Sequence, residues 1–123
     1  MADFEHLLKS YDIGDALDDL ASADPPPYLH RCFAEGSAAP ALPWHRVQQL
    51  AVCAMVLDAI VNDRDYEFFE RELIADWRTH HAAKCAQLKE PASAALRRVL
   101  ERDRPEEPAA RAELALLEHR VAG

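Results

Sequence analysis

Residues 50–61 read LAVCAMVLDAIV, and this stretch decides what kind of fold the chain can adopt. Eleven of its twelve residues are apolar, so a helix formed by them has no polar face to turn toward water. Such a helix belongs in the centre of a bundle, surrounded by other helices. The stretch is shorter than the roughly 18 apolar residues that suggest a membrane span, and it contains Asp58. We therefore expect a core helix that Pro43 opens and that ends near residue 62.

Asp58 is the unusual residue of this helix. A carboxylate on an otherwise apolar helix must find a partner or have its pKa raised, because burial disfavours the charged form. We expect Asp58 to lie near the helix end, to face a gap between helices and to pair with an arginine. A binding or catalytic role is the alternative.

The rest of the chain predicts helices almost throughout. Alanine, leucine, glutamate and arginine dominate, glycine occurs three times, and no segment alternates apolar and polar residues long enough to suggest a strand. With 123 residues, half of them apolar, the chain can bury an independent core. The predicted fold is all-α: residues 1–123 form a single domain, a single compact bundle of five or six helices around a central apolar helix.

The apolar residues of the N-terminal segment change faces near Ile13. Phe4, Leu7, Leu8 and Tyr11 share one helical face, and the apolar residues from Ile13 to Leu20 lie about 180° away. One straight helix would expose one of these clusters. We expect a break at Gly14, with Asp12 or Asp15 capping the second piece.

Residues 22–43 contain five of the eight prolines and predict an irregular connection. Within it, Pro27 could open a short helical turn that ends at Gly36. Two readings stay open for this segment: a docking loop or lid, and a structural strap packed across the bundle.

A long helix is predicted to begin at Asp63 or Asp65 and to reach Glu90, which would make it the longest of the chain. It contains the stretch DWRTHHAAKC, residues 76–85, whose aspartate, histidines and cysteine are of the types that bind zinc. A single ion requires its ligands to converge on one side of the helix.

The angles around the helix argue against such a site. With Asp76 at zero, His80 lies at about 40°, His81 at about 140° and Cys85 at about 180°. Asp76 and His80 are expected to form an exposed ion pair, and His81 and Cys85 to face inward. A zinc site would need further ligands, for which His30, Cys32 and His45 are the candidates. We predict neither a metal nor another cofactor.

Catalytic motifs are absent from the sequence. No serine lies in a GxSxG turn, and no glycine-rich loop could bind a phosphate. A nucleophilic Cys32 beside His30 is the remaining option, but side chains two apart diverge on a helix. We expect no catalytic residue. The C-terminal third predicts two helices, one from Pro91 to near Asp103 and one that Pro105 or Pro108 opens.

The net charge of −8 is concentrated near the N-terminus, because residues 1–24 carry −6 and the rest only −2. This charge would repel nucleic acid and anionic membranes, so we expect neither as a partner. Three cysteines without a CxxC pair argue against a disulfide framework, and the acidic start does not resemble a signal peptide. These features predict a cytoplasmic location.

The charge asymmetry leads to a functional expectation: a small acidic cytosolic interaction module, an inhibitor, immunity-type or adaptor protein, that docks a basic surface of a protein partner without catalysis. The expected contact residues are Asp12, Asp15, Asp18, Asp19, Tyr28 and Phe33. The alternative is a small-ligand or metal-binding bundle that uses His81, Cys85 and Asp58. Homodimerisation through an uncovered apolar stripe also stays open.

Overall fold

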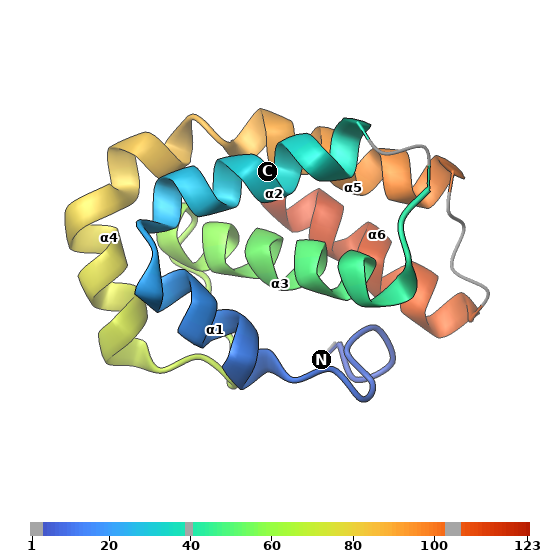
Figure 1. Ribbon diagram of the computed structural model, residues 1–123, viewed down its shortest axis with the longest axis horizontal. Coiled ribbons are helices and arrows are strands. Elements are labelled where there is room, and N and C mark those ends of the chain that lie inside the picture. Colours follow the sequence, from blue (N-terminus) through green and yellow to red (C-terminus); the bar gives the residue numbers. More distant parts are fainter. Residues whose placement is uncertain (1–3, 39–40, 103–106) are drawn as a thin grey trace.

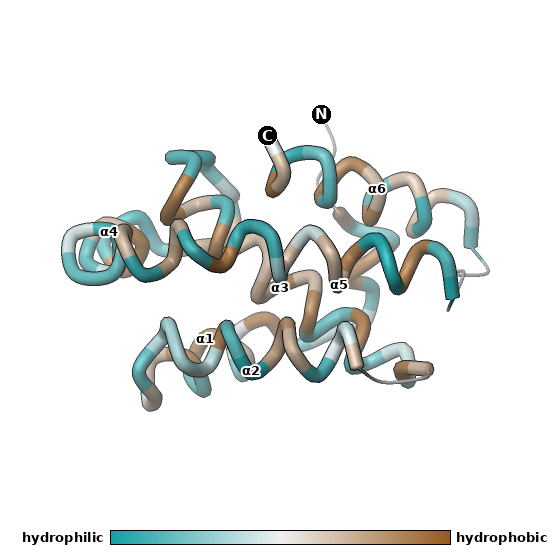
Figure 2. Tube along the Cα trace, turned by 90° about the horizontal axis from the view of Figure 1, so that it is seen from above, coloured by the Kyte–Doolittle hydropathy of each residue, from teal (hydrophilic) through white to brown (hydrophobic). Residues whose placement is uncertain are grey.

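Helix α3 (Trp44–Val61) runs through the middle of the molecule, as the sequence predicts (Figure 1). Every residue from Leu50 to Ile60 is buried, and Asp58 is among them. The other helices surround α3: α1 and α2 lie on one side of it and α6 on the other (Figure 2). The all-α bundle with a central apolar helix is therefore confirmed.

This computed structural model describes residues 4–38, 41–102 and 107–123. Over these ranges the chain forms six helices and no strand. The helices are α1 Ile13–Ser22, α2 Pro25–Ala38, α3 Trp44–Val61, α4 Arg71–Ala86, α5 Lys89–Arg102 and α6 Pro108–Ala122. The expected helix end at Asp103 and the alternative start at Pro105 lie outside the described residues.

The expectation of an irregular connection over residues 22–43 is wrong, because most of it is helix α2. Its three prolines occupy the first turn, where backbone N–H groups have no acceptor within the helix and a missing donor costs nothing. Gly36 does not end the helix. A Cβ there would lie 3.2 Å from Leu50 Cδ2 and 3.4 Å from Ala95 Cβ, so glycine lets α2 approach α3 and α5 closely.

The expectation of one long helix from residue 65 to residue 90 is also wrong. The chain turns at Gln87 and Leu88, which separates α4 from α5, and α3 is the longest helix described. Pro91 explains the interruption, because in a continuous helix its ring would clash with the carbonyl group of Gln87. Residues 63–70, the expected first turns, form instead a loop between α3 and α4.

The N-terminal residues form turns rather than the expected first helix. The break lies before Ile13 and not at Gly14, and the Asp12 side chain caps α1 by accepting a hydrogen bond from Asp15 N at 3.1 Å, which confirms the predicted cap. Leu7 is fully buried in this segment. The buried Gln48 side chain donates to the carbonyl groups of Leu7 (3.1 Å) and Lys9 (3.0 Å), so α3 holds these turns in place.

Glu113 of α6 also anchors the N-terminal turns. Its Oε1 accepts a hydrogen bond from Leu7 N at 2.7 Å, and its Oε2 lies 3.1 Å from His6 Nδ1. The hydrogen bond with Glu113 raises the pKa of His6, and the charges of Glu113, Glu107 and Glu5 add to this effect. Protonated His6 therefore favours the folded state.

We expect a pH dependence of stability that belongs to His6. Because its pKa is higher in the folded than in the unfolded chain, its contribution is complete below the ordinary histidine pKa of about 6.5 and is lost as the pH rises through the folded-state value. Urea unfolding at a series of pH values should show the wild type losing stability relative to His6→Gln as the pH rises. Parallel curves for the two proteins would contradict this expectation.

Candidate functional site

Asp58 is the centre of a buried polar cluster at the C-terminal end of α3. Its Oδ2 accepts hydrogen bonds from Tyr66 Oη at 2.6 Å and Arg64 Nε at 2.8 Å, and its Oδ1 accepts one from Asn62 Nδ2 at 2.7 Å. The carboxylate is fully buried, whereas the Arg64 side chain is 40% exposed. The predicted pairing of Asp58 with an arginine near the helix end is thus confirmed.

The three donors to Asp58 all lie in the loop between α3 and α4 or at its start. They fold this loop back over the end of α3. Burial, and then the hydrogen bond to Asp58, raise the pKa of Tyr66 well above its ordinary value, so its hydroxyl group stays a donor. Asn62 Nδ2 also donates to Arg120 O at 3.2 Å, which ties the same point to α6.

Arg78 fixes the other side of the loop. From α4 it donates to the carbonyl groups of Ala59 (2.8 Å) and Ile60 (3.3 Å), which lie in the last turn of α3, where carbonyl groups lack an N–H donor within the helix. It also pairs with Asp63 at 2.9 Å. Asp63 has a φ of 54°, in the left-handed region, where the chain turns out of α3.

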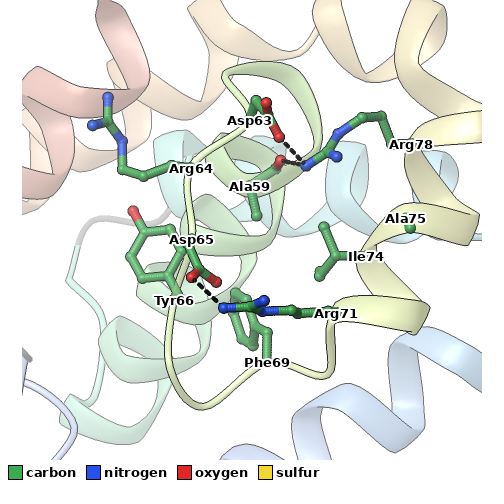
Figure 3. Close-up of a pocket in the computed structure, with 10 residues that line it drawn as sticks. All are labelled: Ala59, Asp63, Arg64, Asp65, Tyr66, Phe69, Arg71, Ile74, Ala75 and Arg78. Carbon is green, nitrogen blue, oxygen red and sulfur yellow. Dashed lines mark hydrogen bonds and ion pairs between the residues drawn. The ribbon is translucent and has the colours of Figure 1, made fainter.

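A cleft of about 430 Å³ lies between this loop and α4 (Figure 3). Phe69 and Ile74, both 7% exposed, form part of its apolar surface together with Tyr66. Two ion pairs border it: Arg78 with Asp63, and Arg71 with Asp65 at 3.4 Å. The cleft is thus lined both by apolar side chains and by groups of both charges.

In the stretch DWRTHHAAKC, the outward placement of Asp76 and His80 and the inward placement of Cys85 agree with the predicted angles, whereas His81 is only partly buried, with 24% of its side chain exposed. Asp76 and His80 form an exposed pair, with 3.3 Å between Asp76 Oδ1 and His80 Nδ1. Cys85 is buried, and burial raises the pKa of its thiol to about 11. His81 Nε2 lies 4.0 Å from Asp24 Oδ1, a neighbour from the turn between α1 and α2 that the sequence alone does not reveal. Among the described residues, no three His, Cys, Asp or Glu side chains are placed to hold a metal ion.

Two other cysteines come together although the sequence gives no sign of it. Cys32 of α2 lies close to Cys53 of α3, and the interaction between the two thiols, together with burial, raises the pKa of Cys53 well above its ordinary value. Cys32 is partly exposed and Cys53 is buried. Because the thiolate is the nucleophilic form, Cys53 is not activated for catalysis.

The four aspartates singled out in the N-terminal segment all lie on the surface. Asp12 caps α1, and Asp15, Asp18 and Asp19 are exposed along it. Within the described ranges, no basic side chain forms an ion pair with these last three. Some acids elsewhere do have such a partner: Glu35, Asp63 and Glu90 each pair with an arginine. Helix α1 is therefore an acidic face without its own counter-charges in this part of the chain.

The two aromatic residues predicted for the same contact face differ in their exposure to solvent. Tyr28 is partly exposed, its Oη accepts a hydrogen bond from Gln49 Nε2 at 3.0 Å, and the Arg31 guanidinium lies 5.6 Å from its ring centre. Phe33 is fully buried in the core. The expectation that Phe33 touches a partner is wrong for this structure, because α2 turns that side of its helix toward the bundle interior.

The fold and these sites define an all-helical bundle with an acidic face on α1 and a cleft of mixed polarity beside the α3–α4 loop. No protein-family model matches the chain, and neither curated proteins nor solved structures give a significant match. Over the described residues, no helix combines the length and the hydropathy needed to cross a membrane.

Proposed function

We propose that this protein is a small, non-catalytic interaction module that docks a basic surface of a partner protein through the acidic face of α1. The observation that carries the proposal is the exposure of Asp15, Asp18 and Asp19 on one short helix without a paired cation in the described ranges. These carboxylates are available to an arginine-rich or lysine-rich partner surface. The chemistry fits an inhibitor, an immunity-type protein or an adaptor.

Charge supports this assignment over its alternatives. The first 24 residues carry most of the net charge of −8, so the negative electrostatic potential of the molecule is concentrated around its N-terminal region. Such a field attracts a basic partner and speeds the encounter, and it repels phosphate backbones and anionic membranes. The partly exposed Tyr28, near the start of α2, would extend the contact beyond the charged residues.

The properties of the thiols support a role without catalysis. The pKa values of Cys53 and Cys85 are both raised, whereas a nucleophilic cysteine needs a lowered pKa. Both carboxylate oxygens of the buried Asp58 accept hydrogen bonds from neighbouring side chains. We place the module in the cytosol, since its three cysteines lack a disulfide framework.

The test is a charge-neutralised variant that keeps the fold. Asp15→Asn, Asp18→Asn and Asp19→Asn are combined, and Asp12 is left in place because it caps α1. With a partner recovered by the wild type and then purified, the variant should associate about tenfold more slowly at low salt, because electrostatic steering is lost. The wild-type rate should fall with added salt much more than the variant rate. Stopped-flow or surface-based kinetics would measure both.

A matched control carries the same charge change elsewhere. Glu67→Gln, Glu72→Gln and Glu101→Gln alter three exposed acids outside α1. This control should keep nearly the wild-type association rate. If both triple variants slow association equally, net charge and not the α1 face governs binding. If neither does, the proposed docking face is wrong.

A further inference from the structure

We propose that the cleft between the α3–α4 loop and helix α4 binds a free α-amino acid with an apolar side chain. The juxtaposition that carries this inference is an opposed pair of charges, Arg71 and Asp65, at a cleft of about 430 Å³ that apolar and charged side chains line together. Its residues are distinct from those of the α1 face, so this site stands independently of the docking function.

The pair at the border is the part of the cleft that can open. Arg71 NH2 lies 3.4 Å from Asp65 Oδ2, and the two side chains are 84% and 69% exposed. An exposed ion pair of this kind contributes only about 0 to 1 kcal/mol, so a ligand can separate it at little cost. Once separated, the guanidinium presents parallel N–H donors to a carboxylate and the aspartate accepts from an ammonium group. An α-amino acid carries both groups on adjacent atoms.

The interior of the cleft suits an apolar side chain. Phe69, Ile74 and Tyr66 line it, and the rings of Phe69 and Tyr66 are 5.6 Å apart between centres. The volume of about 430 Å³ falls near the lower end of the range for small-molecule sites. Leucine or phenylalanine would place its side chain there and remove apolar surface from water.

The rest of the border is held in place before any ligand arrives. Arg78 is fixed by two α3 carbonyl groups and by Asp63, and Tyr66 is fixed by its 2.6 Å hydrogen bond to the buried Asp58. Only the Arg71–Asp65 pair must move. A site whose walls are already ordered avoids much of the entropy cost of binding.

The charge balance of the cleft favours a zwitterion over an anion. Arg71 and Arg78 face Asp65 and Asp63, and Arg64 is paired with Asp58. In Figure 3 the guanidinium of Arg64 points away from the Arg71–Asp65 pair. No excess positive charge remains to attract a phosphate or a dicarboxylate, whereas a ligand with one charge of each sign meets a partner for both.

The direct test is titration of the isotope-labelled protein with L-leucine and with L-phenylalanine, followed by NMR. We expect saturable shifts confined to residues 63–78, with a dissociation constant below about 1 mM for at least one of the two. Two leucine analogues each lack one charged group: 4-methylpentanoate has no amine and 3-methylbutylamine has no carboxylate. Each should bind about tenfold more weakly, because one charge-assisted contact is lost.

Two surface variants test the border pair. Arg71→Gln and Asp65→Asn should each weaken binding of the amino acid about tenfold while leaving the fold intact, because both side chains are exposed. Arg97→Gln is the matched control, since Arg97 forms a similar exposed pair with Glu90 at 3.3 Å on α5. It should bind as the wild type does. Absence of saturable shifts up to about 10 mM ligand, or binding of either analogue as tightly as leucine itself, would overturn the proposal.

Discussion

Replacing Asp58 by alanine should lower the free energy of unfolding by about 3 kcal/mol or more. The carboxylate is fully buried, and Tyr66, Arg64 and Asn62 all donate to it. Its removal leaves Tyr66 and Arg64 without this acceptor, leaves Asn62 with Arg120 O alone, and opens a cavity. Because Arg64 is 40% exposed it can turn toward water, so the loss should lie near the lower end of the 3–5 kcal/mol that breaking a buried pair costs.

Urea unfolding followed by circular dichroism would measure this loss. Asp65→Ala is the control, an exposed aspartate in the same loop, and should change the stability by no more than about 0.5 kcal/mol. Hydrogen exchange of the 62–70 loop should accelerate in Asp58→Ala before the rest of the molecule is affected. A loss below about 1 kcal/mol would mean that Asp58 does not hold the loop.

The second large effect is expected for Ala54→Glu, in the middle of α3. Ala54 is fully buried, and every residue around it from Leu50 to Ile60 is buried as well. A glutamate there has neither room nor a nearby surface to reach. The combined overpacking and desolvation should cost about 4 kcal/mol or more, a large share of the roughly 5 to 15 kcal/mol that stabilises a domain.

We expect Ala54→Glu to lose its cooperative thermal transition or to melt at a much lower temperature, as measured by circular dichroism. Ala112→Glu makes the same chemical change on an exposed position of α6 and should fold like the wild type. If both variants were equally stable, α3 would have a solvent-facing side and its central placement would be wrong.

The sequence predicts those features that depend on a few neighbouring residues. The apolar run of residues 50–61 indicates the buried helix, Asp12 can be recognised as a cap, and Asp76 and His80 can be paired by their spacing. Hydrophobic periodicity and capping act over one or two turns, so they are visible without knowledge of the fold. The need of Asp58 for an arginine follows from the cost of burying a charge.

The features that the sequence did not predict share a different cause. Consecutive prolines suggest an irregular chain, yet at the first turn of α2 they lose no hydrogen bond, and only the position of the helix start reveals this. Phe33 could face a partner or the core, and its burial depends on how α2 packs. The contacts of Asp24 with His81 and of Cys32 with Cys53 join separate elements, so no local sequence pattern predicts them.

The cleft is the clearest case of a site that could not be predicted. Its border residues lie within residues 63–78, where the sequence favours one continuous helix, and a helix would have spread them around its circumference. The structure instead folds residues 62–70 back over the end of α3, which brings Asp65 opposite Arg71. The buried Asp58 supplies the acceptors that make this loop stable.

By itself, then, the sequence determined that the chain is helical, that α3 is the core and that the acids gather near the N-terminus, because propensity, apolar content and charge are properties of residues and short segments. The tertiary structure alone decided which thiols and carboxylates meet, which aromatic rings stay accessible and where a cavity remains. Those outcomes depend on packing between segments far apart in the chain, and packing is settled only when all the helices are placed together.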